Sequence, residues 1–153
     1  MPRKVGGVKL ADSVVSSGET IFTYKGRNIT ALDVFVYPPV AADTSDGTVR
    51  EELRSEAKGF QDGLSAGITQ GWYEEYQVAF DAEKPVQTGD GLVPGFMVAA
   101  VLLRGGRTSV SLFYIYFLRG VFIKIRLTIP DVRWSTNPAL NFPTELIHLV
   151  AKS

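Results

Sequence analysis

Two short glycine-containing turns constrain the fold of this chain more than any other feature of its sequence. Gly105-Gly106 and Arg119-Gly120 each separate long runs of β-branched, aromatic and aliphatic residues. A two-residue loop joins neighbouring antiparallel strands and pairs the residues on either side of it, so the register follows from the turn positions. The sequence therefore predicts an antiparallel meander over residues 95–103, 108–118 and 121–129.

The predicted register divides the side chains of these strands between two faces of the sheet, because side chains alternate along a strand. One face is nearly all apolar and carries Met97, Ala99, Val101, Leu103, Val110, Leu112, Tyr114, Tyr116, Leu118, Val121, Ile123, Ile125, Leu127 and Ile129. The mixed face is apolar at one end and polar at the other, and carries Phe96, Val98, Ala100, Leu102, Ser109, Ser111, Phe113, Ile115, Phe117, Phe122, Lys124, Arg126 and Thr128. A sheet with apolar residues on both faces indicates a layered sandwich.

More strands are expected before the meander. Residues 20–25 and 29–37 are rich in β-branched and aromatic side chains and flank a short turn, Gly26-Arg27-Asn28, so they predict a β-hairpin. Pro38-Pro39 ends its second strand, because proline cannot donate a ladder hydrogen bond. Residues 76–80 alternate apolar and polar side chains and predict the first strand of a four-stranded meander.

A long amphipathic helix is predicted over residues 48–70. Thr48 and Glu51 have the spacing of a capping box at its start. Apolar residues then recur every three or four positions, at Val49, Leu53, Ala57, Phe60, Leu64 and Ile68. We expect this helix to cover the all-apolar face of the sheet.

The same helix carries glycines at every fourth position, Gly59, Gly63, Gly67 and Gly71. Each glycine within a helix costs about 1 kcal/mol relative to alanine, so the pattern needs a reason. Close packing of the helix backbone inside the domain is the favoured interpretation, and a groove for self-association is the alternative. A third interpretation applies to Gly71 alone, which would end the helix.

The chain ends in a second predicted helix, with residues 145–152 as its body and Pro138 or Pro143 in its first turn. Leu146, Leu149 and Val150 would cover the mixed face. The predicted fold class is α+β: an antiparallel sheet made of an N-terminal hairpin plus a four-stranded meander, order β-β-α-β-β-β-β-α, with a helix on one face and a C-terminal helix, as a single domain over residues 1–153.

Composition excludes several classes of protein. The 153 residues are 45% hydrophobic and 21% charged, which is typical of a folded domain, and the absence of cysteine excludes disulfides and thiolate chemistry. Sixteen basic and sixteen acidic residues give no net attraction for nucleic acid. The longest apolar runs, 98–103 and 113–118, are much shorter than the roughly 20 residues of a membrane span.

No apolar run follows the charged start of the sequence, so no signal peptide is predicted as written. The expected location is the periplasm or the cell envelope if a leader has been removed, and the cytoplasm otherwise. Charge is unevenly distributed: residues 1–93 carry nine basic and fourteen acidic residues, and residues 94–153 carry seven and two. An acidic helix facing a basic sheet explains this division, and a basic face for an anionic partner is the alternative.

The sequence contains no recognisable catalytic constellation. His148 is the single histidine, which excludes histidine-pair metal sites and Ser-His-Asp spacings. Gly89-Asp90-Gly91 lacks the context of a phosphate-binding loop. Acidic residues near the start of the long helix complement its dipole and do not fit a calcium loop: Asp43, Asp46, Glu51 and Glu52. We therefore predict no enzyme activity, no cofactor and no metal, and we interpret Asp33 as a solvent-facing strand residue.

One surface is a candidate binding site. Lys124 and Arg126 alternate with apolar residues, so both charges lie on the mixed face, near Phe113 and Phe122 and flanked by Arg119. Cationic groups beside aromatic rings are typical of protein interfaces and can bind carboxylate or phosphate. The alternative is that these charges only prevent aggregation of a strand edge.

A resemblance to known proteins rests on four segments. Pro2-Arg3-Lys4-Val5-Gly6-Gly7, Phe22-Thr23-Tyr24, Asp33-Val34-Phe35-Val36-Tyr37-Pro38 and Phe122-Ile123-Lys124-Ile125-Arg126-Leu127-Thr128 flank the long helix. Together they resemble a family of bacterial domains of unknown function, many of them exported, and the element order is similar to that of PsbP-like α/β/α sandwich proteins. The resemblance implies a protein-binding or assembly role.

Two functions remain open from the sequence. The first is a non-enzymatic interaction or assembly module of the bacterial cell envelope, with a protein partner and the possibility of homo-oligomers. The alternative is a carrier of a small apolar molecule, in a pocket between helix and sheet lined by Tyr114, Tyr116, Phe60 and Trp72. The glycine pattern favours the module, because close packing of the helix would leave no space for a ligand.

Overall fold

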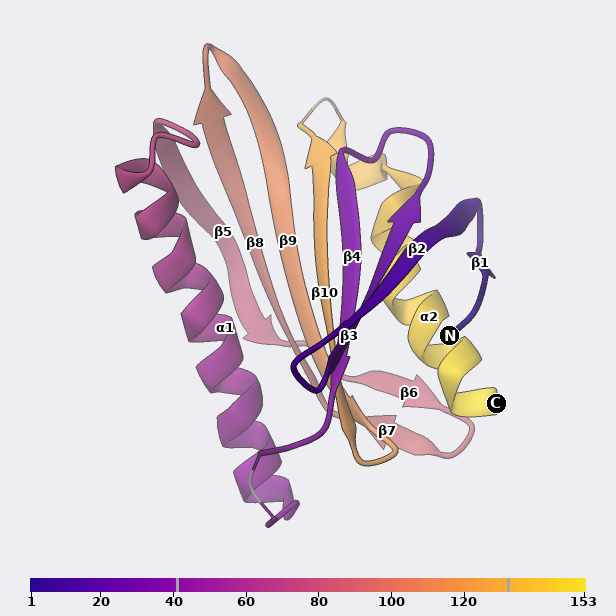
Figure 1. Cartoon of the computed structure of the whole chain (residues 1–153). Helices are drawn as coiled ribbons and strands as arrows, with labels where there is room; N and C mark the ends of the chain where they lie inside the picture. Colours follow the sequence, from indigo (N-terminus) through magenta and orange to yellow (C-terminus); the bar gives the residue numbers. More distant parts are fainter. Residues whose placement is uncertain (41, 132) are drawn as a thin grey trace.

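The computed structural model describes residues 1–40, 42–131 and 133–153, and its centre is one eight-stranded sheet (Figure 1). The strands are β1 (Lys4–Val5), β2 (Val8–Ser16), β3 (Glu19–Lys25), β4 (Ala31–Tyr37), β5 (Glu75–Glu83), β6 (Val86–Thr88), β7 (Gly91–Val93), β8 (Gly95–Arg104), β9 (Arg107–Leu118) and β10 (Val121–Pro130). The helices are α1 (Asp46–Thr69) and α2 (Phe142–Lys152), with short 3-10 turns at Trp134–Thr136 and Pro138–Asn141. The sheet order is β1-β2-β3-β4-β10-β9-β8-β5, and β6 and β7 form a separate hairpin. The predicted α+β layered sandwich is confirmed.

The register predicted from the two tight turns is confirmed. Leu103 pairs with Thr108 and Leu118 pairs with Val121. Both residues of each turn have positive φ, from 53° at Arg119 to 77° at Gly120. This backbone matches the right-handed twist of the strands that it joins, which explains why the meander closes at these positions.

The predicted N-terminal hairpin is also present, as β3 and β4, and β4 joins the meander through β10. Four further strands were not predicted from the sequence: β1, β2, β6 and β7. Most of β2 is exposed, so its sequence lacks the apolar alternation that marks a half-buried strand. A turn with positive φ at Ser17 and Gly18 joins β2 to β3.

The two helices cover the opposite faces from those predicted. α1 packs on β8 and β9 against the mixed face, where Val98, Phe113 and Ile115 are buried. α2 lies on the other side of the sheet, which is also the side of both chain termini (Figure 1). There α2, β1 and the β6–β7 hairpin together bury the all-apolar face. The all-apolar face has to be buried along its whole length, and several short elements together bury it. The mixed face is apolar at one end only, and one helix is sufficient to bury that part.

The ends of the helices differ in detail from the predictions. α1 begins at Asp46 after Ser45, and no side chain caps it, so the predicted capping box is wrong. The Thr48 hydroxyl instead donates to Asp43. Gly71 has a φ of 75° directly after the helix, which confirms that it ends α1. In α2, Leu146 is buried, but against the all-apolar face and not the mixed face, and Leu149 is 41% exposed.

Candidate binding groove between α1 and the sheet

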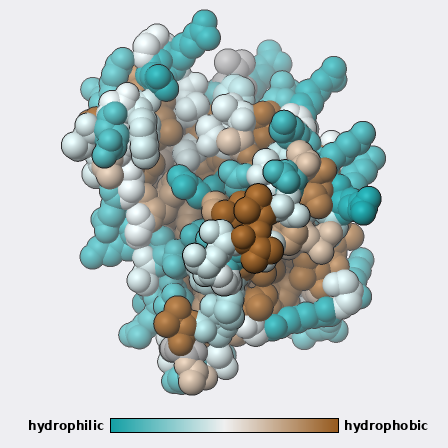
Figure 2. Space-filling view, in the orientation of Figure 1, coloured by the Kyte–Doolittle hydropathy of each residue, from teal (hydrophilic) through white to brown (hydrophobic). Residues whose placement is uncertain are grey.

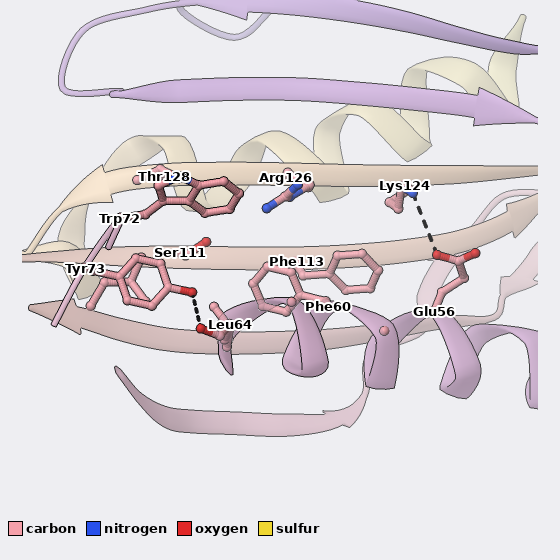
Figure 3. A pocket seen from close by; sticks show the side chains of 13 residues that line it. Glu56, Phe60, Leu64, Trp72, Tyr73, Ser111, Phe113, Lys124, Arg126 and Thr128 are labelled. Atoms are coloured by element: carbon pink, nitrogen blue, oxygen red, sulfur yellow. Dashed lines mark hydrogen bonds and ion pairs between the residues drawn. The ribbon is translucent and has the colours of Figure 1, made fainter. Parts of the chain in front are cut away.

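A groove with a volume of about 450 Å³ lies between α1 and the mixed face of the sheet. Figure 3 shows it from close by, with side chains converging from α1, from the segment after α1, and from β8, β9 and β10. Its lining consists of Glu56, Gly59, Phe60, Gly63, Leu64, Trp72, Tyr73, Leu102, Ser111, Phe113, Lys124, Arg126 and Thr128. The groove combines apolar and aromatic walls with two cations and three hydroxyl groups, which is the usual chemistry of a ligand site.

The glycines of α1 create much of this space. Gly59 and Gly63 are exposed on the groove side, and a Cβ atom added at either would meet no atom within 4 Å. The prediction that these glycines bring the helix backbone against the sheet is therefore wrong at both positions. Leucine at Gly63 would fill the groove rather than overpack an interface.

Gly67 behaves as predicted, because here a side chain does lie close to the helix backbone. A Cβ atom at Gly67 would lie 2.7 Å from Cε1 of Tyr73 and nearer still to the phenol oxygen. The Tyr73 hydroxyl donates a hydrogen bond to the carbonyl of Leu64. Burial raises the pKa of Tyr73, and the nearby positive charge of Arg126 partly offsets this rise. The absence of a side chain at Gly67 therefore leaves room for Tyr73, which forms one wall of the groove.

Lys124 is held within a cluster of aromatic and acidic groups. Its ammonium lies 3.7 Å from a Glu56 carboxylate oxygen, 4.9 Å from the centre of the Phe35 ring and 5.5 Å from that of Tyr37. The Lys124 side chain is only 20% exposed. The Tyr37 hydroxyl is buried without a hydrogen-bond partner in the described structure, and burial followed by the charge of Glu56 raises the pKa of Tyr37.

Arg126 faces the groove as an unpaired cation. Its guanidinium carbon lies 5.7 Å from the centre of the Phe60 ring, and no carboxylate of the described residues lies within ion-pair distance. Asp33 is its cross-strand partner on β4, but a carboxylate oxygen of Asp33 accepts a hydrogen bond from the Thr23 hydroxyl at 2.8 Å. Arg126 is exposed and available to a ligand.

The other residues of the predicted surface lie in different places. Phe113 lines the floor of the groove and stacks on Phe60, with ring centres 5.0 Å apart. Phe122 is 2% exposed and belongs to the core beneath α1. Arg119 lies in the β9–β10 turn and donates to the carbonyls of Ala151 and Ser153 at the end of α2. The structure therefore groups Lys124, Arg126 and Phe113 in one site, without Phe122 and Arg119.

The residues predicted to line a carrier pocket lie on two different faces of the sheet. Tyr114 and Tyr116 are buried in the core on the α2 side, so they lie on the wrong face of the sheet. Phe60 and Trp72 line the groove, and Trp72 is 61% exposed. Sequence reasoning missed Glu56 and Tyr73 as parts of the site. Glu56 precedes Phe60 by one helical turn, so the helical period would have placed it on the groove face once the position of α1 was known.

The remaining chemical candidates lie away from the groove. His148 is half-buried on α2, and its Nε2 atom lies 2.8 Å from the Gln87 carbonyl of β6. In the described ranges, no group of three or more His, Asp or Glu side chains is arranged to hold a metal ion. Among the helices of those ranges, none is long and apolar enough to cross a membrane.

Comparison with known proteins identifies the fold. No family model matches the chain, and no curated protein matches its sequence. The solution structure of cyanobacterial PsbP (CyanoP) from Synechocystis sp. PCC 6803 superposes with a TM-score of 0.61 at 17% identity, over 94% of this chain and 81% of that one. The protein therefore has a PsbP-like fold, as the resemblance in its sequence implied.

Two further structures are more distant. One is a putative regulator of unknown function from Pseudomonas aeruginosa, with a TM-score of 0.41 and 8% identity, over 95% of this chain and 88% of that one. The other is a STAR-related lipid transfer protein fragment from Xanthomonas axonopodis, with a TM-score of 0.37 and 12% identity, over 95% and 96% of the two chains. At these TM-scores neither likeness bears on function.

Proposed function

We propose that this protein is a non-enzymatic binding domain and that the groove beneath α1 takes a segment of a partner protein. The observation that carries this proposal is the gathering of Arg126, Lys124, Phe60, Phe113 and Trp72 around one recess open to solvent. Arginine and large aromatic residues dominate the binding energy of protein interfaces.

The surroundings of the groove favour an extended partner over a compact small molecule. A second recess, of about 400 Å³, meets the groove at Glu56 and Lys124. An apolar row also leads from Lys124 across the strands that α1 does not cover, through Phe35, Ile21 and Val14 in register. Val14 is 53% exposed, and Figure 2 shows apolar surface in the middle of this face. A protein segment can follow such a track beyond the groove itself.

Site-specific photo-crosslinking tests this proposal. A benzoylphenylalanine in place of Trp72, an aromatic residue of the groove lining that is 61% exposed, would face the groove without filling it, and the same residue at Lys58, which is exposed and outside the groove lining, is the matched control. We expect crosslinks to a partner protein from position 72 and not from position 58, in a lysate of the source organism. We also expect Arg126→Gln to abolish them. Equal crosslinking from both positions, or none from either, would contradict a groove-bound partner.

A small-molecule carrier is the second candidate, supported by the volume of the groove. About 450 Å³ falls within the range of roughly 300–1,000 Å³ that is typical of ligand pockets. Native mass spectrometry of the purified protein tests it. A carrier should show an added mass that denaturation releases and that Gly63→Leu, which fills the groove, removes. A protein-binding module should show the bare mass of the chain.

A further inference from the structure

We infer that the groove recognises an acidic side chain of the partner segment, through Arg126 first and through Lys124 in competition with Glu56. This inference rests on the proposed function and specifies the chemistry of the partner. The occupant is a protein segment in which a carboxylate stands next to an aromatic or apolar side chain.

Arg126 carries a positive charge that pairs with no carboxylate of the described residues. A guanidinium binds a carboxylate through two parallel hydrogen bonds, and such charge-assisted bonds are stronger than neutral ones. Inside the protein the obvious counter-ion, Asp33, is engaged by Thr23 instead. Arg126 therefore retains its full capacity to bind an external carboxylate.

Aromatic side chains form the walls of the groove around Arg126. Phe60 lies on its helix side, and Trp72 and Phe113 border the same groove (Figure 3). Aromatic walls exclude water from a bound ion pair, and an ion pair is stronger where water is scarce. The same rings provide contact area for an apolar side chain next to the ligand carboxylate.

Lys124 lies close to Arg126 and forms an ion pair with Glu56. Residues two apart on a strand point to the same face about 6–7 Å apart, so a ligand carboxylate at Arg126 approaches Lys124 as well. Glu56 reaches Lys124 from α1 at 3.7 Å, at the place where the two recesses meet. Glu56 thus occupies in the free protein the position that a second ligand oxygen would take.

The charge of the surroundings selects a single carboxylate rather than a polyanion. The chain carries no net charge, and Glu56 lies inside the groove with Asp33 directly beside Arg126 in register. A nucleic acid or polyphosphate would bring several negative charges against these carboxylates. A peptide with one acidic side chain avoids most of this repulsion.

Two N-acetylated and C-amidated peptides, Ala-Phe-Glu-Ala and Ala-Phe-Gln-Ala, test the inference because they differ only in the charge. We would titrate each into ¹⁵N-labelled protein and follow the amides of Gly59, Gly63 and Gly67 and the Nε–H of Arg126. The Glu peptide should shift these signals saturably, with an affinity at least about tenfold above that of the Gln peptide.

Three variants locate the effect. Arg126→Gln should weaken binding of the Glu peptide at least about tenfold, to the level of the Gln peptide. Arg104→Gln removes the same charge from an exposed residue at the end of β8 and should change nothing. Glu56→Gln frees Lys124 and should tighten binding of the Glu peptide severalfold.

The outcomes separate this inference from the proposed function. Equal binding of the two peptides, or binding that survives Arg126→Gln, would overturn acidic recognition, whereas crosslinking from position 72 would still support a groove-bound partner. No shift at the groove with either peptide would overturn the inference. Inorganic phosphate binding as tightly as the Glu peptide would indicate a general anion site and overturn the assignment to an acidic protein segment.

Discussion

Substituting alanine at two glycines of the same helix should change stability in opposite directions. At Gly63 an added Cβ meets no atom within 4 Å, so the substitution adds only the helix preference of alanine. That preference is worth about 1 kcal/mol at an interior position. Gly63→Ala is therefore expected to stabilise the protein by about 1 kcal/mol.

At Gly67 the new methyl group collides with Tyr73. Its Cβ would lie 2.7 Å from Cε1, so the ring must move and the hydrogen bond to the Leu64 carbonyl breaks. Overpacking costs about 1–3 kcal/mol, and the lost hydrogen bond about 0.5–1.5 kcal/mol, against a gain of less than about 1 kcal/mol in helix preference near the end of α1. We expect Gly67→Ala to destabilise the protein by about 1–3 kcal/mol.

Urea unfolding and thermal melts of the two variants measure this difference. For a chain of this length, each kcal/mol corresponds to a change of about 2–4 °C in melting temperature. In a Tyr73→Ala background the cost of Gly67→Ala should disappear, because the colliding ring is gone. Destabilisation by Gly63→Ala would refute the placement of Gly63 beside open space. Stabilisation by Gly67→Ala would refute the contact with Tyr73.

Three further predictions concern pH, charge and catalysis. Burial raises the pKa of Tyr24 and Tyr114 to about 12, so their contribution to stability is complete below about pH 10 and is lost as the pH rises from 10 to 12. Unfolding free energy measured across this range should fall by up to about 1.4 kcal/mol per pH unit for each tyrosine, and a flat profile would contradict their burial. Lys124→Glu places a second carboxylate against Glu56 and should lower the free energy of unfolding by about 1–3 kcal/mol. Lys124→Met removes the charge without this repulsion and should lower the free energy of unfolding by less. Equal effects of the two variants in urea titrations would show that repulsion by Glu56 is unimportant. The purified protein should turn over no substrate in a broad hydrolase and phosphatase screen, and turnover that disappears in His148→Ala would reveal an active site.

The strands of the meander could be placed from the sequence because their register depends on local geometry. Two-residue turns at Gly105-Gly106 and Arg119-Gly120 leave one pairing possible, and side-chain alternation then assigns each residue to a face. The placement of Lys124 and Arg126 on one face with Phe113 followed from this counting alone. The strand β2 escaped detection because most of its residues are exposed, and an exposed strand needs no apolar alternation.

The faces that the helices cover were decided by tertiary structure. Both faces of the meander are apolar enough to receive a helix, so hydrophobic patterning could not choose between them. The choice depends on the whole chain, because α2, β1 and the β6–β7 hairpin together cover the larger apolar face. Two of these three elements, β1 and the hairpin, were not predicted from the sequence.

The glycines of α1 show the same limit at the scale of single residues. Their spacing established that one side of the helix has no side chains, but a missing side chain can permit close contact or leave a space. At Gly67 the space is filled by Tyr73, and at Gly59 and Gly63 it is the groove. The sequence determined where side chains are absent, and only the tertiary structure decided what lies opposite them, because those neighbours come from distant strands.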